Sequence, residues 1–218
     1  MEVWNHLLLI IRYAESITLL AREDLILLPA ANVIARSTLE AGYRAMWLLD
    51  PIDPFEREAR WVVYLETGVE HYKKLSQSKV IDPSLRNEFL ARYEQCSEFA
   101  KRIRLLLLNE NISVNSKYPG FNEVIAAQSL PDCYHLFILL SAYTHGNFAA
   151  LEHYREHLGT AKRMGEFIEA NDWKLPLSVA GAILFYVAER FLKNIDVDVS
   201  ECFKPTLIRK FNEMLKSL

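Results

Sequence analysis

Glycine and proline are scarce in this chain, which has 7 glycines and 8 prolines among 218 residues. Collagen-like repeats and flexible low-complexity segments need far more of both residues, so these classes are excluded. Hydrophobic residues make up 51% of the sequence and charged residues 24%. A chain of this composition and length can bury a sizeable core, and it is typical of one domain or of two small ones.

Cysteine is also rare, and the three cysteines lie too far apart for a zinc-binding CxxC pair or a disulfide framework. They are Cys96, Cys133 and Cys202. We therefore expect reduced thiols, a cytoplasmic protein, and neither a metal nor any other cofactor.

No sign of charge dominates, because 25 basic residues stand against 28 acidic ones and the net charge is −3. The chain thus lacks the overall basic character of many proteins that bind nucleic acids or anionic membranes.

Long apolar runs are missing as well. Leu7 to Ile11 is too short for a signal peptide, and Leu175 to Ala188 falls short of the ~20 residues of a membrane span. We interpret the second run as a buried core helix and expect no membrane partner.

Strand patterns are nearly absent, whereas apolar residues recur throughout at helical spacing. The sequence predicts an all-α protein, a single-domain helical bundle of about eight or nine helices. Its firmest boundaries are an aspartate cap followed by proline, at Asp53-Pro54 and at Asp82-Pro83. The predicted helices span approximately residues 4–24, 30–49, 54–76, 83–108, 129–145, 147–159, 161–170, 175–193 and 204–218, with a short one from 122.

The domain organisation predicted from the sequence is simple. No linker is long or flexible enough to divide the chain, so residues 1–218 are expected to form one domain. The candidate motifs lie within a core of about residues 30–147, and helices from residues 148–218 are expected to pack on that core.

Arg36, Glu40 and Arg44 recur every four residues on a helix whose other positions are mostly apolar. Side chains at this spacing share one helix face, so the three residues form a narrow charged stripe. Two interpretations remain open. Either the stripe faces water and forms pairs within the helix, or it is buried and needs hydrogen-bonding partners, because an unpaired buried charge costs several kcal/mol.

A second polar cluster follows a very apolar helix, where the segment beginning at Ser141 reads Ser-Ala-Tyr-Thr-His-Gly-Asn. His145 stands at the predicted C-terminus of this helix, and Gly146 is expected to terminate it. The histidine either caps the helix or acts as a general acid or base. In the second case Tyr143 and Asn147 are candidates, together with Ser141, for supporting or binding a substrate.

The segment His153 to His157 matches the HxxEH pattern, in which two histidines one turn apart hold zinc and the glutamate activates water. Such sites also need a third, acidic ligand, for which Glu189 is a candidate, and a larger α/β frame that this sequence does not predict. We therefore assign no metal site and interpret the pattern as a solvated helix face.

Several functional motifs are absent from the sequence: GxGxxG, GxxxxGK[ST], GxSxG, the EF-hand loop and any DNA-binding motif. Nucleotide binding by a glycine loop, hydrolase-elbow chemistry and calcium sensing therefore have no support. The helically spaced aromatic residues are interpreted as packing residues rather than as base-stacking residues; they are Trp47, Trp61, Tyr64 and Tyr72.

The Arg-Ser-x-x-Glu segment at 36–40 and the Ser-x-x-x-His-Gly segment at 141–146 together resemble a bacterial all-helical family of unknown function with the same short motifs. The similarity covers roughly residues 30–147. That family is in turn distantly similar to the HEPN superfamily of helical bundles. Many HEPN proteins are dimeric, metal-independent ribonucleases linked to toxin–antitoxin and phage-defence systems.

The resemblance implies that His145 activates the RNA 2′-hydroxyl or protonates the leaving oxygen, while an arginine stabilises the charge that develops at phosphorus. HEPN nucleases carry this arginine a few residues before the histidine, where the present sequence has Ile138 to Ser141. The nearest upstream arginine is Arg104, on another predicted helix. We expect Arg36 to replace it in space, with Glu40 beside it.

Three functions are compatible with these patterns. The first is a HEPN-like, RNA-acting protein, either an active ribonuclease or a catalytically degenerate one. The second is a non-enzymatic module, in which excess apolar surface forms a homodimer or binds a helical partner. The third is a small-ligand pocket between bundle helices. The acidic pI of about 6.1 weighs against tight RNA binding.

Overall fold

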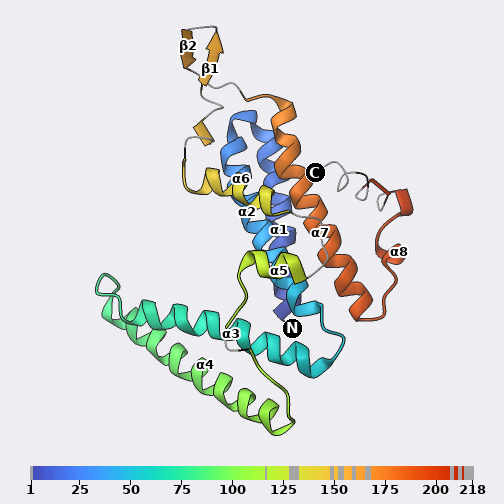
Figure 1. The fold of residues 1–218 in the computed structure, drawn as a ribbon. Coiled ribbons are helices and arrows are strands. Elements are labelled where there is room, and N and C mark those ends of the chain that lie inside the picture. Colours follow the sequence, from blue (N-terminus) through green and yellow to red (C-terminus); the bar gives the residue numbers. More distant parts are fainter. Residues whose placement is uncertain are drawn as a thin grey trace. The chain divides into compact units, whose positions relative to one another are not determined.

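The computed structural model describes residues 2–115, 117–127, 133–147, 150–151, 155–158, 161–164, 168–206, 209–210 and 213. These residues form an all-α fold, apart from one short β-hairpin (Figure 1). The chain divides into two compact units. Unit 1 comprises Met1–Leu49 and Phe121–Leu218, and unit 2 comprises Asp50–Gly120. The predicted single domain over residues 1–218 stays a prediction.

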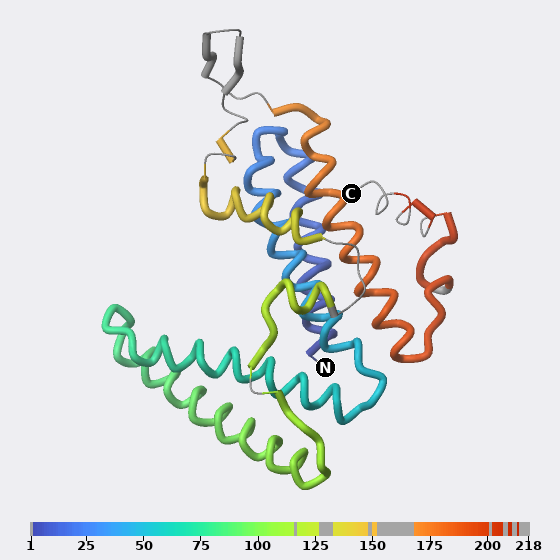
Figure 2. Tube along the Cα trace, viewed as in Figure 1, coloured from blue at the N-terminus to red at the C-terminus, as the bar shows by residue number. Residues whose placement is uncertain are grey.

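Three long helices lie side by side in unit 1: α1 (Glu2–Glu23), α2 (Leu28–Leu49) and α7 (Lys174–Asn194) (Figures 1 and 2). The central helix is α2, because both other helices pack on it and most of its circumference is buried. Pro29 lies in its first turn, as predicted, where a missing N–H leaves no hydrogen bond unmade.

The helices of unit 1 are joined by two specific contacts. Gly42 of α2 lies so close to α7 that a Cβ atom there would collide with the side chain of Ile183. The single-turn helix η1 (Leu25–Leu27) connects α1 to α2, and its Leu25 carbonyl accepts a 3.0 Å hydrogen bond from the Trp173 indole of the short helix η3 (Ala170–Trp173). These contacts align α7 with the α1–α2 pair.

Shorter helices complete unit 1. Helix α5 (Phe121–Ala127) and helix α6 (Tyr134–Thr144) both pack against α2. The one-turn helix α8 (Val199–Cys202) follows α7 and begins at an Asp198 cap. The predicted start of a helix at residues 129–132 and most of the predicted helix 204–218 lie outside the described residues.

Unit 2 is a helical hairpin formed by α3 (Pro54–Ser76) and α4 (Pro83–Asn109). Both helices begin as the sequence predicts, because the carboxylates of Asp53 and Asp82 each accept a hydrogen bond from the backbone N–H two residues later. Proline at the first helical position has no N–H to leave unpaired, so it favours the same start. The core between the two helices contains Ala59, Val62, Ala100 and Leu107.

The predicted helices at 147–159 and 161–170 are wrong. Residues Arg155–Leu158 form strand β1 and residues Ala161–Met164 form strand β2, which pair antiparallel with Arg155 opposite Met164. The described residues therefore contain seven helices of seven or more residues, slightly fewer than the eight or nine predicted.

One helical stretch, Ala170–Asn194, is long and apolar enough to cross a membrane by length and composition. Half of its most apolar 18-residue stretch is buried within the structure. The core helix of a soluble protein can have the same length and composition, so this stretch alone is weak support for a membrane span.

Candidate functional site

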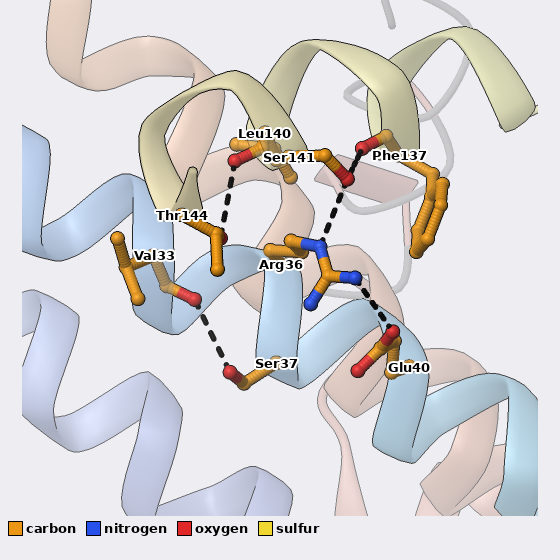
Figure 3. Close-up of polar contacts among 8 residues, drawn as sticks. All are labelled: Val33, Arg36, Ser37, Glu40, Phe137, Leu140, Ser141 and Thr144. Carbon is orange, nitrogen blue, oxygen red and sulfur yellow. Dashed lines mark hydrogen bonds and ion pairs between the residues drawn. The ribbon is translucent and has the colours of Figure 1, made fainter. Parts of the chain in front are cut away.

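Arg36 connects the two motifs that the sequence singles out. Its Nε donates a 2.9 Å hydrogen bond to Ser141 Oγ of α6, a residue 105 positions away in the sequence (Figure 3). Its Nη2 lies 3.0 Å from Glu40 Oε1, one turn further along α2. The guanidinium also lies over the Phe137 ring, with Cζ 4.8 Å from the ring centroid. Three different groups therefore fix the orientation of this arginine.

Ser141 both accepts and donates at this site. Its hydroxyl accepts from Arg36 and donates a 2.6 Å hydrogen bond to the Phe137 carbonyl, one turn earlier on α6. Serine within a helix commonly bonds back to this carbonyl. Here the bond leaves a lone pair of Oγ directed toward α2, where it accepts from Arg36. Two consecutive hydrogen bonds therefore connect the α6 backbone to the Arg36 guanidinium.

The charged pair is neither fully solvated nor fully buried. The side chain of Arg36 is 18% exposed and that of Glu40 29%. The structure thus combines elements of both sequence interpretations, since the pair is intrahelical and yet lies against a second helix. At this exposure the pair is worth only about 1 kcal/mol. Its clearer effect is geometric, because it holds the guanidinium against α6.

His145 ends α6 and its side chain is exposed. The N–H of Gly146 bonds to the Tyr143 carbonyl at 3.3 Å, and that of Asn147 bonds to the Ala142 carbonyl at 3.1 Å. Gly146 has φ +59°, so these bonds form the Schellman motif that terminates many helices. The prediction of Gly146 as the terminating residue is confirmed, and His145 is held at the last position before the turn.

The distance along α6 links His145 to the Arg36 contact. Ser141 lies four residues before His145, and the His145 N–H bonds to the Ser141 carbonyl at 3.0 Å. Four residues correspond to a rise of about 6 Å along a helix axis. The described contacts therefore bring Arg36, Glu40 and Ser141 together, and they place His145 one turn beyond that group.

The remaining predicted site residues lie outside this cluster. Arg44 is exposed near the end of α2, and its charge adds to the effect of burial in lowering the pKa of His6, on α1, to about 4. Tyr143 is half-buried on α6, and Asn147 is exposed in the turn that follows. The backbone of Asn147 closes the Schellman motif.

The metal-site pattern does not form a helix. His153 and Tyr154 lie outside the described residues, and the rest of the pattern belongs to strand β1. The interpretation of the pattern as a solvated helix face is therefore wrong for Arg155–Leu158. This described part also lacks the helical geometry that an HxxEH zinc site needs. Among the described residues no cluster of three or more histidine, cysteine, aspartate or glutamate side chains could hold a metal ion.

Arg104 has a structural role within unit 2. Its Nε and Nη2 donate to the two oxygens of Glu66 at 2.6 and 2.7 Å, and Nη2 also donates to the Asn115 carbonyl at 2.8 Å. The hydrogen bond to Glu66 raises the pKa of Arg104. This arginine thereby connects α3, α4 and the segment that follows α4.

Sequence reasoning missed the aromatic residues around Arg36. The Phe137 ring stacks on Phe121 with centroids 4.1 Å apart, and Tyr134 stacks on Phe137 at 6.2 Å. Tyr43 of α2 meets Phe121 edge to face at 4.9 Å. A usable signal was the position of Phe137, four residues before Ser141 and therefore on the same face of α6.

The comparisons with known proteins identify no relative. No family model, no curated protein and no solved structure matches this chain.

Proposed function

We propose that this chain is a HEPN-like, RNA-acting protein whose site is formed by Arg36, Glu40, Ser141 and His145. The observation that carries the proposal is the Arg36–Ser141 hydrogen bond of 2.9 Å. It joins the Arg-Ser-x-x-Glu segment to the Ser-x-x-x-His-Gly segment, on which the resemblance to the family rests. A cytoplasmic, bacterial protein with a defence or toxin–antitoxin role belongs to the same proposal.

His145 carries the proton transfer in this mechanism. Its exposed imidazole either takes the proton of an RNA 2′-hydroxyl, whose oxygen then attacks the adjacent phosphorus, or protonates the oxygen that leaves. The proposed reaction uses no metal ion, because the named side chains supply the proton transfer and the charge stabilisation. Proton transfer by a positioned histidine contributes roughly 100- to 10,000-fold to a rate.

Arg36 stabilises the negative charge that develops on the phosphoryl oxygens. Its Nε is bound to Ser141 and its Nη2 to Glu40, so the guanidinium is oriented before substrate arrives. Glu40 and Ser141 are positioning residues in this proposal. Glu40 also offsets part of the arginine charge.

The decisive experiment measures cleavage of a fluorescent single-stranded RNA in EDTA by the full-length protein. His145→Ala and Arg36→Ala are compared with wild type, and the matched control is His135→Ala, because His135 is also an exposed histidine on α6. Circular dichroism checks that each variant keeps its helical content. We expect wild type and the control to cleave the RNA. The cleavage rate of His145→Ala should be at least a hundredfold lower, on the order of the contribution of a positioned histidine.

Other outcomes are equally informative. Cleavage that persists in His145→Ala contradicts the assigned role of this histidine. Absence of cleavage by every protein, with RNA binding retained, indicates the degenerate form. Absence of both cleavage and binding rejects the RNA-acting proposal.

A second candidate function is a dimeric interaction module. The observation that favours it is the apolar surface left exposed on α6, where Ile138 is 55% and Leu139 43% exposed. In this proposal the Arg36–Glu40 pair fixes the packing of α2 against α6, which is an attested use of partly buried charges. Light scattering of wild type and Ile138→Glu/Leu139→Glu tests it, and a monomeric wild type would rule it out.

A further inference from the structure

The aromatic rings beside Arg36 form a nearly parallel set, which we call the aromatic platform: Phe121, Phe137 and Tyr134. The plane of Phe121 is inclined by 26° to that of Phe137, and the plane of Tyr134 by 14°. Aromatic pairs in proteins prefer offset or edge-to-face arrangements, and both occur here. Tyr134 lies parallel to Phe137 but offset, with centroids 6.2 Å apart, and Tyr43 meets Phe121 edge to face at 70°. A planar group that stacks on Tyr134 therefore also lies nearly parallel to Phe137.

The aromatic platform is only partly covered. Phe121 and Phe137 are half-buried, and Tyr134 is 38% exposed at the first position of α6. The guanidinium of Arg36 lies over Phe137, so a planar cation borders the same rings. Exposed aromatic rings combined with an arginine are the elements with which proteins hold single-stranded nucleic acids.

We propose that Tyr134 is a base-stacking residue that holds a nucleobase of a single-stranded RNA bound along α6. This inference rests on the proposed function and adds to it the form of the substrate, a single strand with an unstacked base. The base extends the parallel set at Tyr134, while the ribose–phosphate backbone runs toward Arg36 and His145.

The length of α6 fixes which part of the strand binds where. Tyr134 precedes His145 by eleven residues, which corresponds to about 16 Å along the helix axis. A base on Tyr134 therefore belongs to a nucleotide several positions from the phosphate next to His145. Substrates shorter than this span lose the stacking contact, so we expect very short RNAs to bind more weakly.

Stacking has a recognisable binding signature. Every base has a π-face, so the contact tolerates any sequence, and it does not read the 2′-hydroxyl. The one arginine at the platform is paired with Glu40, so few counterions are released on binding. We therefore expect comparable affinities for single-stranded RNA and DNA, and a shallow dependence of affinity on salt.

The test measures the affinity of full-length protein for oligo(dT), which no 2′-hydroxyl chemistry can cleave, by titration calorimetry. Tyr134→Ala is compared with Tyr134→Phe, which keeps the ring, and with Leu19→Ala, which removes exposed apolar surface from α1. A second probe is an abasic oligonucleotide with the same number of phosphates.

We expect Tyr134→Ala to weaken oligo(dT) binding by about tenfold, the low end of the range for one stacked base. Tyr134→Phe and Leu19→Ala bind as wild type does. The abasic probe binds wild type with the same tenfold loss, and Tyr134→Ala adds nothing further, because ring and base belong to one contact.

Three results would overturn the inference: no oligo(dT) binding by wild type, equal binding by Tyr134→Ala, or equal losses in Tyr134→Ala and Leu19→Ala. If Tyr134→Ala does not fold, Tyr134→Leu, which keeps apolar bulk without a ring, takes its place in the same comparison. Failure of the proposed function looks different, because wild type then neither binds nor cleaves RNA, whereas failure of this inference alone leaves RNA binding or cleavage intact and independent of the Tyr134 ring.

Discussion

At the scale of single residues, the most consequential group outside the candidate site is His6. It is buried on α1, and burial together with the charge of Arg44 lowers its pKa from 6.5 to about 4. The folded chain therefore binds this proton less tightly than the unfolded chain does. A difference of this size corresponds to about 3 kcal/mol of stability.

This linkage predicts how stability depends on pH. The contribution of neutral His6 is complete above pH 6.5 and is lost as the pH falls toward 4, where the folded form also binds the proton. Urea unfolding across this window is the measurement. His6→Leu should flatten the decline, whereas His135→Gln, at an exposed histidine, should leave it unchanged. An equal decline in wild type and His6→Leu would show that other groups cause it.

Ser141 offers a second prediction at the residue scale. Ser141→Ala leaves the Arg36 Nε without its acceptor and should lower the free energy of unfolding by about 1–2 kcal/mol. Ser37→Ala is the matched control, because among the described residues Ser37 Oγ bonds only to the Val33 carbonyl of its own helix. Alanine favours a helix more than serine, so this control should be neutral or slightly stabilising. If chemical denaturation gives the same change in the free energy of unfolding for both variants, the hydrogen bond to Arg36 does not contribute to stability.

At the scale of elements, the packing of α2 on α7 depends on Gly42. Gly42→Ala places a Cβ against Ile183 and should lower the melting temperature, at a cost of about 1–3 kcal/mol for overpacking. Gly68 of α3 has open space around its Cα, so Gly68→Ala should stabilise by about 0.5–1 kcal/mol. Thermal unfolding of both variants compares them, and a neutral Gly42→Ala would mean that the two helices shift apart freely.

The helix boundaries also explain what could be predicted from the sequence. Asp53-Pro54 and Asp82-Pro83 act within two residues, so the starts of α3 and α4 could be inferred locally. The hairpin at 155–164 could not, because neither four-residue strand shows a clear alternation of apolar and polar residues.

In the candidate site, too, features within one helix could be predicted from the sequence, whereas contacts between distant positions could not. The stripe of Arg36 and Glu40 follows from spacing within one helix, and so does the end of α6 at His145. The bond between Arg36 and Ser141 joins positions 105 residues apart, and no local pattern specifies it. Local spacing places Phe137 on the same face of α6 as Ser141, but its contact with Arg36 arises only once α6 lies against α2.

At the scale of the whole molecule, burial is distributed unequally. Helix α2 of unit 1 has 13 buried residues among 22, whereas α4 of unit 2 has 2 among 27. Regions with few buried contacts open more readily than the rest of a protein. We therefore expect α4 amides to exchange with solvent deuterium well before those of α2. Equal protection, measured by mass spectrometry under native conditions, would contradict this expectation.

Unit 1 is assembled from two separate stretches of chain, with residues 50–120 between them. During synthesis, α2 leaves the ribosome long before α6 exists, so Arg36 emerges without the serine that orients it. Any incomplete product that stops before residue 141 lacks both Ser141 and His145. The order of the chain thus confines the proposed activity to molecules that extend past residue 145 of 218, a useful property for a protein whose substrate would surround it during translation.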